Sequence, residues 1–219
     1  MIYKLFASLS LLFVFSLGHA QQDPQAKKIL DQFAGRAKKY KATRIDFTLT
    51  LDDRKEKTKR AFKGNVCMKA EQFRLETPDY VIFSDGKEVW NYLKASNEVN
   101  ISKAKSKKDE DLFLSNPTKL FTLYKKDYKY QLIGRETIKG KSCYLIDLFP
   151  FDLNRSYARI RLVIDATKYE LVTAVSFGKS GTIYEFNVDK LNSAIAITDT
   201  ELKFDKARYP NVEVNDMRF

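Results

Sequence analysis

The stretch from residue 80 to residue 92, YVIFSDGKEVWNY, constrains the fold most because its pattern is typical of a β-hairpin. Asp85-Gly86 lies between two apolar runs, and this dipeptide tolerates the positive φ angles of a two-residue type I′ turn. A turn centred there would pair Val81 with Trp90. Period-two alternation puts four large side chains on one face: Val81, Phe83, Trp90 and Tyr92. Ile82 and Val89 fall on the other face, so both faces should be covered or should line something.

The first twenty residues resemble a cleaved export signal. Lys4 supplies a positive charge, residues 5–17 form an apolar run, and Gly18-His19-Ala20 offers small residues at a cleavage site. The run is shorter than the roughly 20 residues that a membrane span needs, so a retained membrane anchor is the less favoured interpretation. We expect a signal peptide over residues 1–20 and a single exported domain over residues 21–219.

The chain is basic, with a formal net charge of +11. The basic residues gather at residues 36–41, 54–60 and 103–108, but aromatic residues do not alternate with them as in a nucleic-acid groove. We therefore expect no nucleic-acid partner. A solvated surface is the favoured explanation, and transient attraction to anionic membranes is the alternative.

The order of the elements is read from caps, turns and periodicity. Asp23-Pro24 is typical of a helix start, and apolar residues recur at helical spacing from Ala26 to Tyr40. Asn116-Pro117 repeats this start signal before a short, largely apolar helix of about two turns. The rest of the chain alternates as strands: 44–52, 62–68, 72–77, 80–93, 97–102, 128–137, 142–149, 156–165, 170–177, 182–189, and a last short strand near the end. This pattern predicts a mainly β fold: a long antiparallel meander that curls into a barrel or half-barrel, with the short helices placed to cover its open mouth.

The sequence lacks the residues that several kinds of catalytic and binding sites require. No histidine follows residue 20, and no glycine-rich phosphate loop or dinucleotide fingerprint occurs. The plentiful carboxylates show no spacing beyond that of surface charges. Cys67 and Cys143 show no metal or redox spacing. An oxidising compartment would allow a disulfide between them, but we favour two unpaired thiols buried in strands. We predict no enzyme activity, no cofactor and no metal site.

Apolar surface remains as the candidate functional feature, because a curled sheet has a concave face that can enclose a ligand cavity. The candidates to line that cavity are strand residues: Phe47, Leu49, Phe62, Val66, Met68, Phe73, Leu75, Val81, Phe83, Trp90 and Tyr92. The candidates to cover it as a lid are residues of the two helices: Ile29, Leu30, Phe33, Leu120, Phe121 and Tyr124.

Short motifs along the chain resemble the LolA-type outer-membrane lipoprotein carriers. They are Ile45-Asp46-Phe47-Thr48, Ser84-Asp85-Gly86-Lys87 with Val89-Trp90-Asn91-Tyr92 (similar to the family's SDGK-x-x-W-x-Y hairpin), Asn116-Pro117, Phe204-Asp205, Tyr209-Pro210 and Val212-Glu213-Val214. Each motif is short, but their order extends over the whole exported domain. The resemblance implies an open barrel of about eleven strands with a helical lid over a hydrophobic cavity.

The resemblance also implies a function. It implies a monomeric periplasmic chaperone that accepts acylated lipoproteins from an inner-membrane lipoprotein-releasing ABC transporter and carries them to an outer-membrane acceptor. The alternative is a binding protein of the same fold for another lipid or glycolipid, or a non-enzymatic sensory or structural domain of the envelope. One departure concerns the family's lid-latching Arg after the Lys of the third strand, because Lys69 is followed here by Ala70. Arg74 is the candidate substitute.

Overall fold

The computed structural model describes residues 22–104 and 116–218. The signal peptide expected over residues 1–20 lies outside the described residues, as does most of the basic stretch 103–108. Within the described residues, twelve strands form one sheet: β1 (Thr43–Asp53), β2 (Thr58–Lys69), β3 (Gln72–Glu76), β4 (Tyr80–Ser84), β5 (Glu88–Leu93), β6 (Glu98–Lys103), β7 (Tyr128–Ile138), β8 (Lys141–Pro150), β9 (Tyr157–Asp165), β10 (Leu171–Gly178), β11 (Thr182–Asn192) and β12 (Glu213–Asp216).

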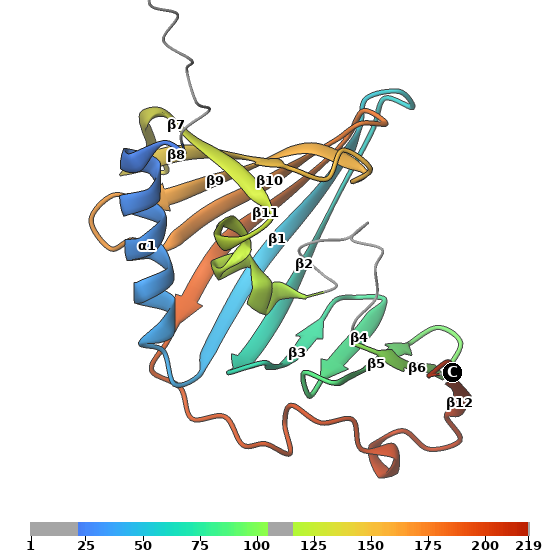
Figure 1. Ribbon diagram of the computed structural model, residues 1–219. Coiled ribbons are helices and arrows are strands. Elements are labelled where there is room, and N and C mark those ends of the chain that lie inside the picture. Colours follow the sequence, from blue (N-terminus) through green and yellow to red (C-terminus); the bar gives the residue numbers. More distant parts are fainter. Residues whose placement is uncertain (1–21, 105–115, 219) are drawn as a thin grey trace, which may run out of the picture.

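The sheet is curled but open, which confirms the predicted fold class (Figure 1). Its order is β12-β6-β5-β4-β3-β2-β1-β11-β10-β9-β8-β7, so β1 lies in the interior of the sheet and β12 and β7 form its two edges. Neighbouring strands are antiparallel except β12, which pairs in parallel with β6. The strands predicted from period-two alternation are all present.

Helix α1 (Pro24–Lys38) begins where the sequence predicts. The Asp23 carboxylate accepts hydrogen bonds from the backbone N–H groups of Gln25 and Ala26, at 2.9 and 3.0 Å. Its second oxygen accepts from the Leu132 N–H at 2.9 Å, which ties the start of the helix to β7. The same residue therefore caps the helix and docks it on the sheet.

The second helical segment differs from its prediction. Instead of one two-turn helix, two short 3₁₀ helices are present, η1 (Pro117–Phe121) and η2 (Leu123–Lys125). Asn116 caps η1 as predicted, since its side chain accepts from the Lys119 N–H. Thr122 lies between the two helices with a φ of −128°, outside the helical range, and so interrupts the segment.

The concave face of the sheet carries the main core, here called the inner cluster. It comprises buried residues of α1, η1, η2 and the concave face of the strands, among them Leu30, Phe33, Phe47, Leu75, Leu120, Tyr124, Leu148, Ile160 and Phe186. The rings of Phe47 and Phe186 lie 4.6 Å apart, across the pairing of β1 with β11. Gly64 of β2 leaves room for this packing, because a Cβ there would lie 2.5 Å from the Phe47 ring.

The convex face carries a second apolar contact, here called the outer cluster: Val81, Phe83, Trp90 and Tyr92 of β4 and β5, with Phe204 and Tyr209 of the C-terminal segment. This segment, residues 193–212, runs beneath β3 to β6 (Figure 1). Ring centroids join Phe83 to Phe204 at 5.9 Å, and Tyr92 to Tyr209 at 4.3 Å. Trp90 pairs with Phe83 and therefore shares its face. The hairpin is apolar on both sides because each side has its own cover.

The predicted register of this hairpin is wrong, because the turn lies one residue further along the chain than expected. Phe83 pairs with Trp90 and Val81 with Tyr92, so the pairing is shifted by two residues from the prediction. The positive φ falls on Gly86, at +89°, and the central residues are Gly86-Lys87. Asp85 takes the preceding position because its carboxylate accepts from the Lys87 and Glu88 N–H groups, each at 2.8 Å. A shift of two preserves the alternation, so the four large residues still share one face.

Candidate functional site

A groove of about 660 Å³ opens between the end of α1, the start of β1, the β2–β3 turn and η1. Its walls are mostly apolar, with lysines at the rim. The lining residues are Ala34, Ala37, Lys38, Tyr40, Lys41, Thr43, Met68, Lys69, Ala70, Thr118, Phe121 and Thr122. The volume lies within the roughly 300–1,000 Å³ of small-molecule sites.

Small residues on α1 and at the β2–β3 turn make room for the groove. Ala34 and Ala37 present only methyl groups toward it. Ala70 takes a left-handed φ of 55° in the tight turn between β2 and β3. On the opposite side Phe121 contacts the Phe33 ring at 5.4 Å and joins η1 to α1. Movement of η1 would therefore widen the groove and expose part of the inner cluster.

A hydrogen bond between side chains joins α1 to η2. The Tyr124 hydroxyl of η2 donates to the Asp31 carboxylate of α1 at 2.8 Å. Burial and this hydrogen bond raise the pKa of Tyr124 above its usual value. The Lys27 ammonium and the Tyr124 hydroxyl lower the pKa of Asp31. The Tyr124 side chain is buried, but the Asp31 carboxylate is about half exposed, so the bond can break without leaving an unpaired buried charge.

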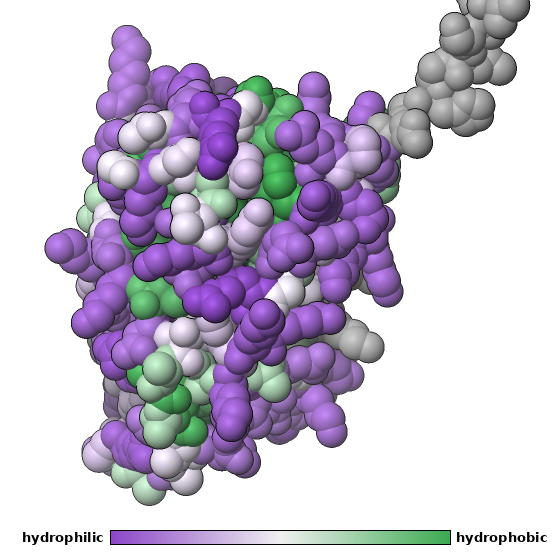
Figure 2. Space-filling view, turned by 90° about the vertical axis from the view of Figure 1, so that its left-hand side faces the viewer, coloured by the Kyte–Doolittle hydropathy of each residue, from purple (hydrophilic) through white to green (hydrophobic). Residues whose placement is uncertain are grey.

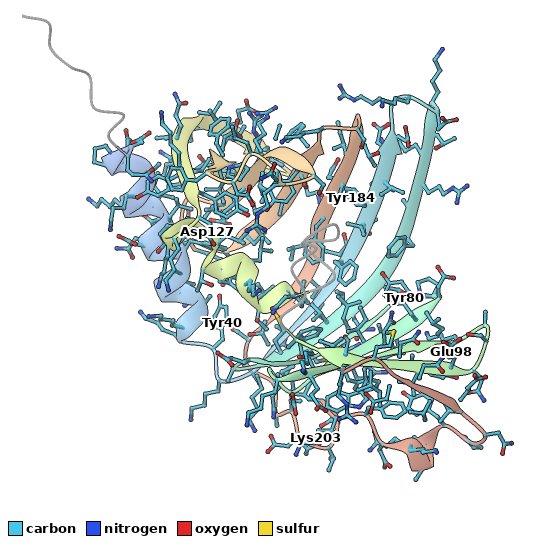
Figure 3. The ribbon with its side chains drawn as sticks, turned by 45° about the vertical axis from the view of Figure 1, so that its right-hand side comes forward. Tyr40, Tyr80, Glu98, Asp127, Tyr184 and Lys203 are labelled. Carbon is cyan, nitrogen blue, oxygen red and sulfur yellow. The ribbon has the colours of Figure 1, made fainter. Side chains whose placement is uncertain are left out.

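The face that helix α1 presents to solvent is largely hydrophilic (Figure 2). At its C-terminal end Tyr40 donates a hydrogen bond to Glu170 at 3.0 Å, and Arg36 bonds the same carboxylate at 3.1 Å. Burial is the main cause that raises the pKa of Tyr40 to about 12. Figure 3 labels Tyr40 where the chain leaves α1 for β1. These bonds attach the rim of the groove to β10 and its preceding turn.

The structure divides the eleven predicted cavity residues between the two faces of the sheet. Seven lie in or against the inner cluster: Phe47, Leu49, Phe62, Val66, Met68, Phe73 and Leu75. The other four lie on the convex face with the outer cluster: Val81, Phe83, Trp90 and Tyr92. The assignment of these four to the concave face is wrong, because alternation identifies residues that share a face but not the direction in which that face points.

The six predicted lid residues lie together. Ile29, Leu30, Phe33, Leu120 and Tyr124 are buried in the inner cluster, and Phe121 packs against it. Only Met68 and Phe121 of all the predicted site residues line the groove itself. The sequence-based analysis missed Ala34 and Ala37 as lining residues. Their position one turn beyond Ile29, Leu30 and Phe33 on the same apolar stripe was the available signal.

Arg74 does not latch the lid. It lies on the convex face, where its guanidinium bonds Glu76 at 2.7 Å and sits 5.7 Å from the centre of the Phe83 ring. Lys69 pairs with Asp199 of the C-terminal segment at 2.8 Å. Lys69 therefore anchors the C-terminal segment, Arg74 contacts residues of β3 and β4 on the convex face, and the bond between Tyr124 and Asp31 joins the helices instead.

The two cysteines are unpaired, as predicted: Cys143 is buried and Cys67 half-buried. Burial raises the pKa of both thiols, which disfavours the reactive thiolate.

Within residues 22–104 and 116–218 no helix is long and apolar enough to cross a membrane. In the same residues no three side chains of the metal-binding types gather in one place.

The family model described as "Outer membrane lipoprotein carrier protein LolA" matches residues 17–179. The chain belongs to the LolA family. Among solved structures, an uncharacterized conserved protein from Thermus thermophilus matches with a TM-score of 0.60 and 16% identity, over 88% of this chain and 99% of that chain. At this identity the match supports the shared fold. No curated protein matches the sequence.

Two further structures have lower scores. A putative outer membrane lipoprotein-sorting protein domain from Vibrio parahaemolyticus matches with a TM-score of 0.48 and 13% identity, over 81% of this chain and 97% of that chain. LprF from Mycobacterium bovis matches with a TM-score of 0.48 and 13% identity, over 81% and 98%. Members of the LolA superfamily are envelope proteins that bind lipids or lipoproteins, and they are binding or carrier proteins rather than enzymes.

Proposed function

We propose that this protein is a periplasmic carrier that binds the acyl chains of lipoproteins and moves them from the inner to the outer membrane. The observation that carries the proposal is the apolar groove, which lies at the junction of both helical segments and continues into the inner cluster. Membership of the LolA family supports it. An inner-membrane lipoprotein-releasing ABC transporter would supply the cargo, and an outer-membrane acceptor would receive it.

The energetics of acyl-chain burial require a cover that resists opening. Each buried CH₂ contributes about 0.8 kcal/mol, so three long chains buried completely would exceed the limit of roughly −18 to −21 kcal/mol for non-covalent binding. Lifting η1 and η2 away from α1 separates Phe121 from Phe33 and breaks the hydrogen bond from Tyr124 to Asp31. These costs lower the net affinity, and closure of the cover then assists release.

A groove-filling variant tests the proposal. Ala37 lines the groove, so Ala37→Trp should reduce affinity for a synthetic triacylated lipopeptide by about tenfold or more, because indole occupies the apolar volume. Gln32→Trp is the matched control, since Gln32 is exposed on the same helix and does not line the groove. Equal affinity of the two variants would contradict the proposed site.

The cargo itself needs a second measurement. Mass spectrometry of the protein isolated from the periplasm should detect acylated polypeptides bound to it. Glycolipid or phospholipid alone would favour the alternative of a binding protein for another lipid. Release of lipoproteins from inner-membrane vesicles that contain the ABC transporter should require the protein and should fall with Ala37→Trp.

A further inference from the structure

One end of the barrel presents exposed apolar and basic side chains together. Three connections meet there: the β1–β2 turn, the β10–β11 turn, and the loop of residues 151–156 between β8 and β9. Figure 1 shows all three at the upper right end of the sheet, away from α1. The Arg54 N–H donates to Gly181 O at 3.4 Å, and the Lys179 N–H donates to Ser156 O at 2.8 Å. We call this end the apex.

Two large apolar side chains of the apex point into solvent. Phe151 is 60% exposed and Leu153 is 79% exposed, the highest values among the large apolar residues that the structure describes. The other exposed residues of this kind, Ile133, Val214 and Met217, lie on or beside the two edge strands. Within residues 22–104 and 116–218, only the loop between β8 and β9 offers two such side chains in close succession at a tip.

The loop is held in shape by its own hydrogen bonds. The Phe151 N–H donates to Asp127 O at 2.9 Å, and the Asn154 N–H donates to the Asp152 carboxylate at 2.9 Å. The Lys179 ammonium donates to the Leu153 carbonyl oxygen. These bonds occupy the polar groups of the loop and leave the side chains of Phe151 and Leu153 without cover.

The charges around this loop are predominantly positive. Arg54, Lys55, Lys57 and Lys179 are exposed on the two neighbouring turns, and Lys59 is exposed near the start of β2. Of the acidic groups there, Asp53 accepts hydrogen bonds from the Lys55 and Glu56 N–H groups, and Asp152 accepts from Asn154. These hydrogen bonds leave the carboxylates charged, so Asp52, Asp53, Glu56 and Asp152 all oppose the basic groups. Apolar side chains that project from a basic surface fit the interface of an anionic bilayer.

We propose that the apex docks the protein on anionic membrane surfaces by inserting Phe151 and Leu153 among the acyl chains while the surrounding lysines contact lipid headgroups. The contact is reversible, since two apolar side chains supply less binding than one lipid anchor. It places the protein on a membrane without an integral partner. The proposal does not depend on the identity of the cargo.

The test uses the purified protein and vesicles of phosphatidylcholine with or without phosphatidylglycerol. The protein should sediment with the anionic vesicles and less with neutral ones, and binding should weaken as salt rises. The double change Phe151→Ser and Leu153→Ser should reduce binding by about tenfold or more. Met217→Ser, which removes an exposed apolar residue elsewhere, is the control and should leave binding unchanged.

A fluorescence readout reports insertion directly, because Trp90 is the only tryptophan of the chain. In a Trp90→Phe background, the tryptophan emission of Phe151→Trp should shift to the blue on anionic vesicles and should be quenched by brominated acyl chains. The emission of Met217→Trp in the same background should show neither response. Absence of vesicle binding, or equal loss of binding with Met217→Ser, would overturn the proposal and leave the apex as a protein-docking surface.

Discussion

The inner and outer clusters bury aromatic rings on opposite faces of one sheet, but they differ in how they are closed. The inner cluster is closed by two separate helical segments, which join each other through ring contact and the partly buried hydrogen bond between Tyr124 and Asp31. The outer cluster is closed by a continuous chain that pairs with β6 through β12 and is held by the ion pair between Lys69 and Asp199. Figure 3 labels Lys203 on this outer cover. The helical segments of the inner cover do not belong to the sheet, whereas the outer cover joins it through β12.

The largest expected effect compares one phenylalanine from each cluster. Phe47→Ala and Phe83→Ala each remove a fully buried ring and should lower the free energy of unfolding by about 3–5 kcal/mol in urea titrations. Lipopeptide affinity should fall with Phe47→Ala and stay unchanged with Phe83→Ala, measured where both variants are folded. A parallel loss of affinity in both would show that the two faces do not act separately.

The next effect concerns the cover of the inner cluster. Leu120 is buried against that cluster from η1, so Leu120→Glu places a charge in an apolar contact. If η1 can swing outward, the charge reaches water, the barrel remains folded, and lipopeptide retention falls. Thermal unfolding and affinity should be measured together.

Leu120→Met is the matched control, since its volume and apolarity are nearly conserved and its cost should stay below about 1.5 kcal/mol. A collapse of stability in Leu120→Glu at least as severe as the loss of binding would mean that η1 is ordinary core rather than a movable cover.

A smaller effect concerns the bond between the helical segments. Tyr124→Phe removes the donor to Asp31 and should cost about 1 kcal/mol near neutral pH. Because the pKa of Asp31 is lowered in the folded protein, its contribution is present above the ordinary carboxyl range and is lost as the pH falls through the folded value. The difference between variant and parent should therefore shrink as the pH is taken below the ordinary carboxyl range. A difference that persists there would indicate lost packing instead.

The smallest expected response is that of Trp90. Its side chain lies on the convex face with the outer cluster, away from the groove. Saturating lipopeptide should therefore leave its emission unchanged. A shift as large as that of tryptophan placed at Phe121, in a Trp90→Phe background, would mean that cargo reaches the convex face.

The local pattern of the sequence determined most of the elements. Asp23-Pro24 located the start of α1. Period-two alternation identified the strands, because successive side chains of a pleated strand point to opposite faces of the sheet. Alternation also showed that β4 and β5 are apolar on both faces. The order of the family motifs predicted an open barrel with a helical cover.

Only the tertiary structure decided which face of the hairpin points inward. Alternation shows which residues share a face, but the direction of that face depends on the neighbouring strands. It also decided the turn: the carboxylate of Asp85 bonds the backbone beyond Gly86 and moves the pairing by two residues. The groove depends on Ala37, Ala70 and Phe121, which are far apart in sequence. The size of each side chain shapes the groove only because the fold brings their three elements together. Local periodicity records the contacts within an element, whereas a cavity is defined by what distant elements leave unfilled.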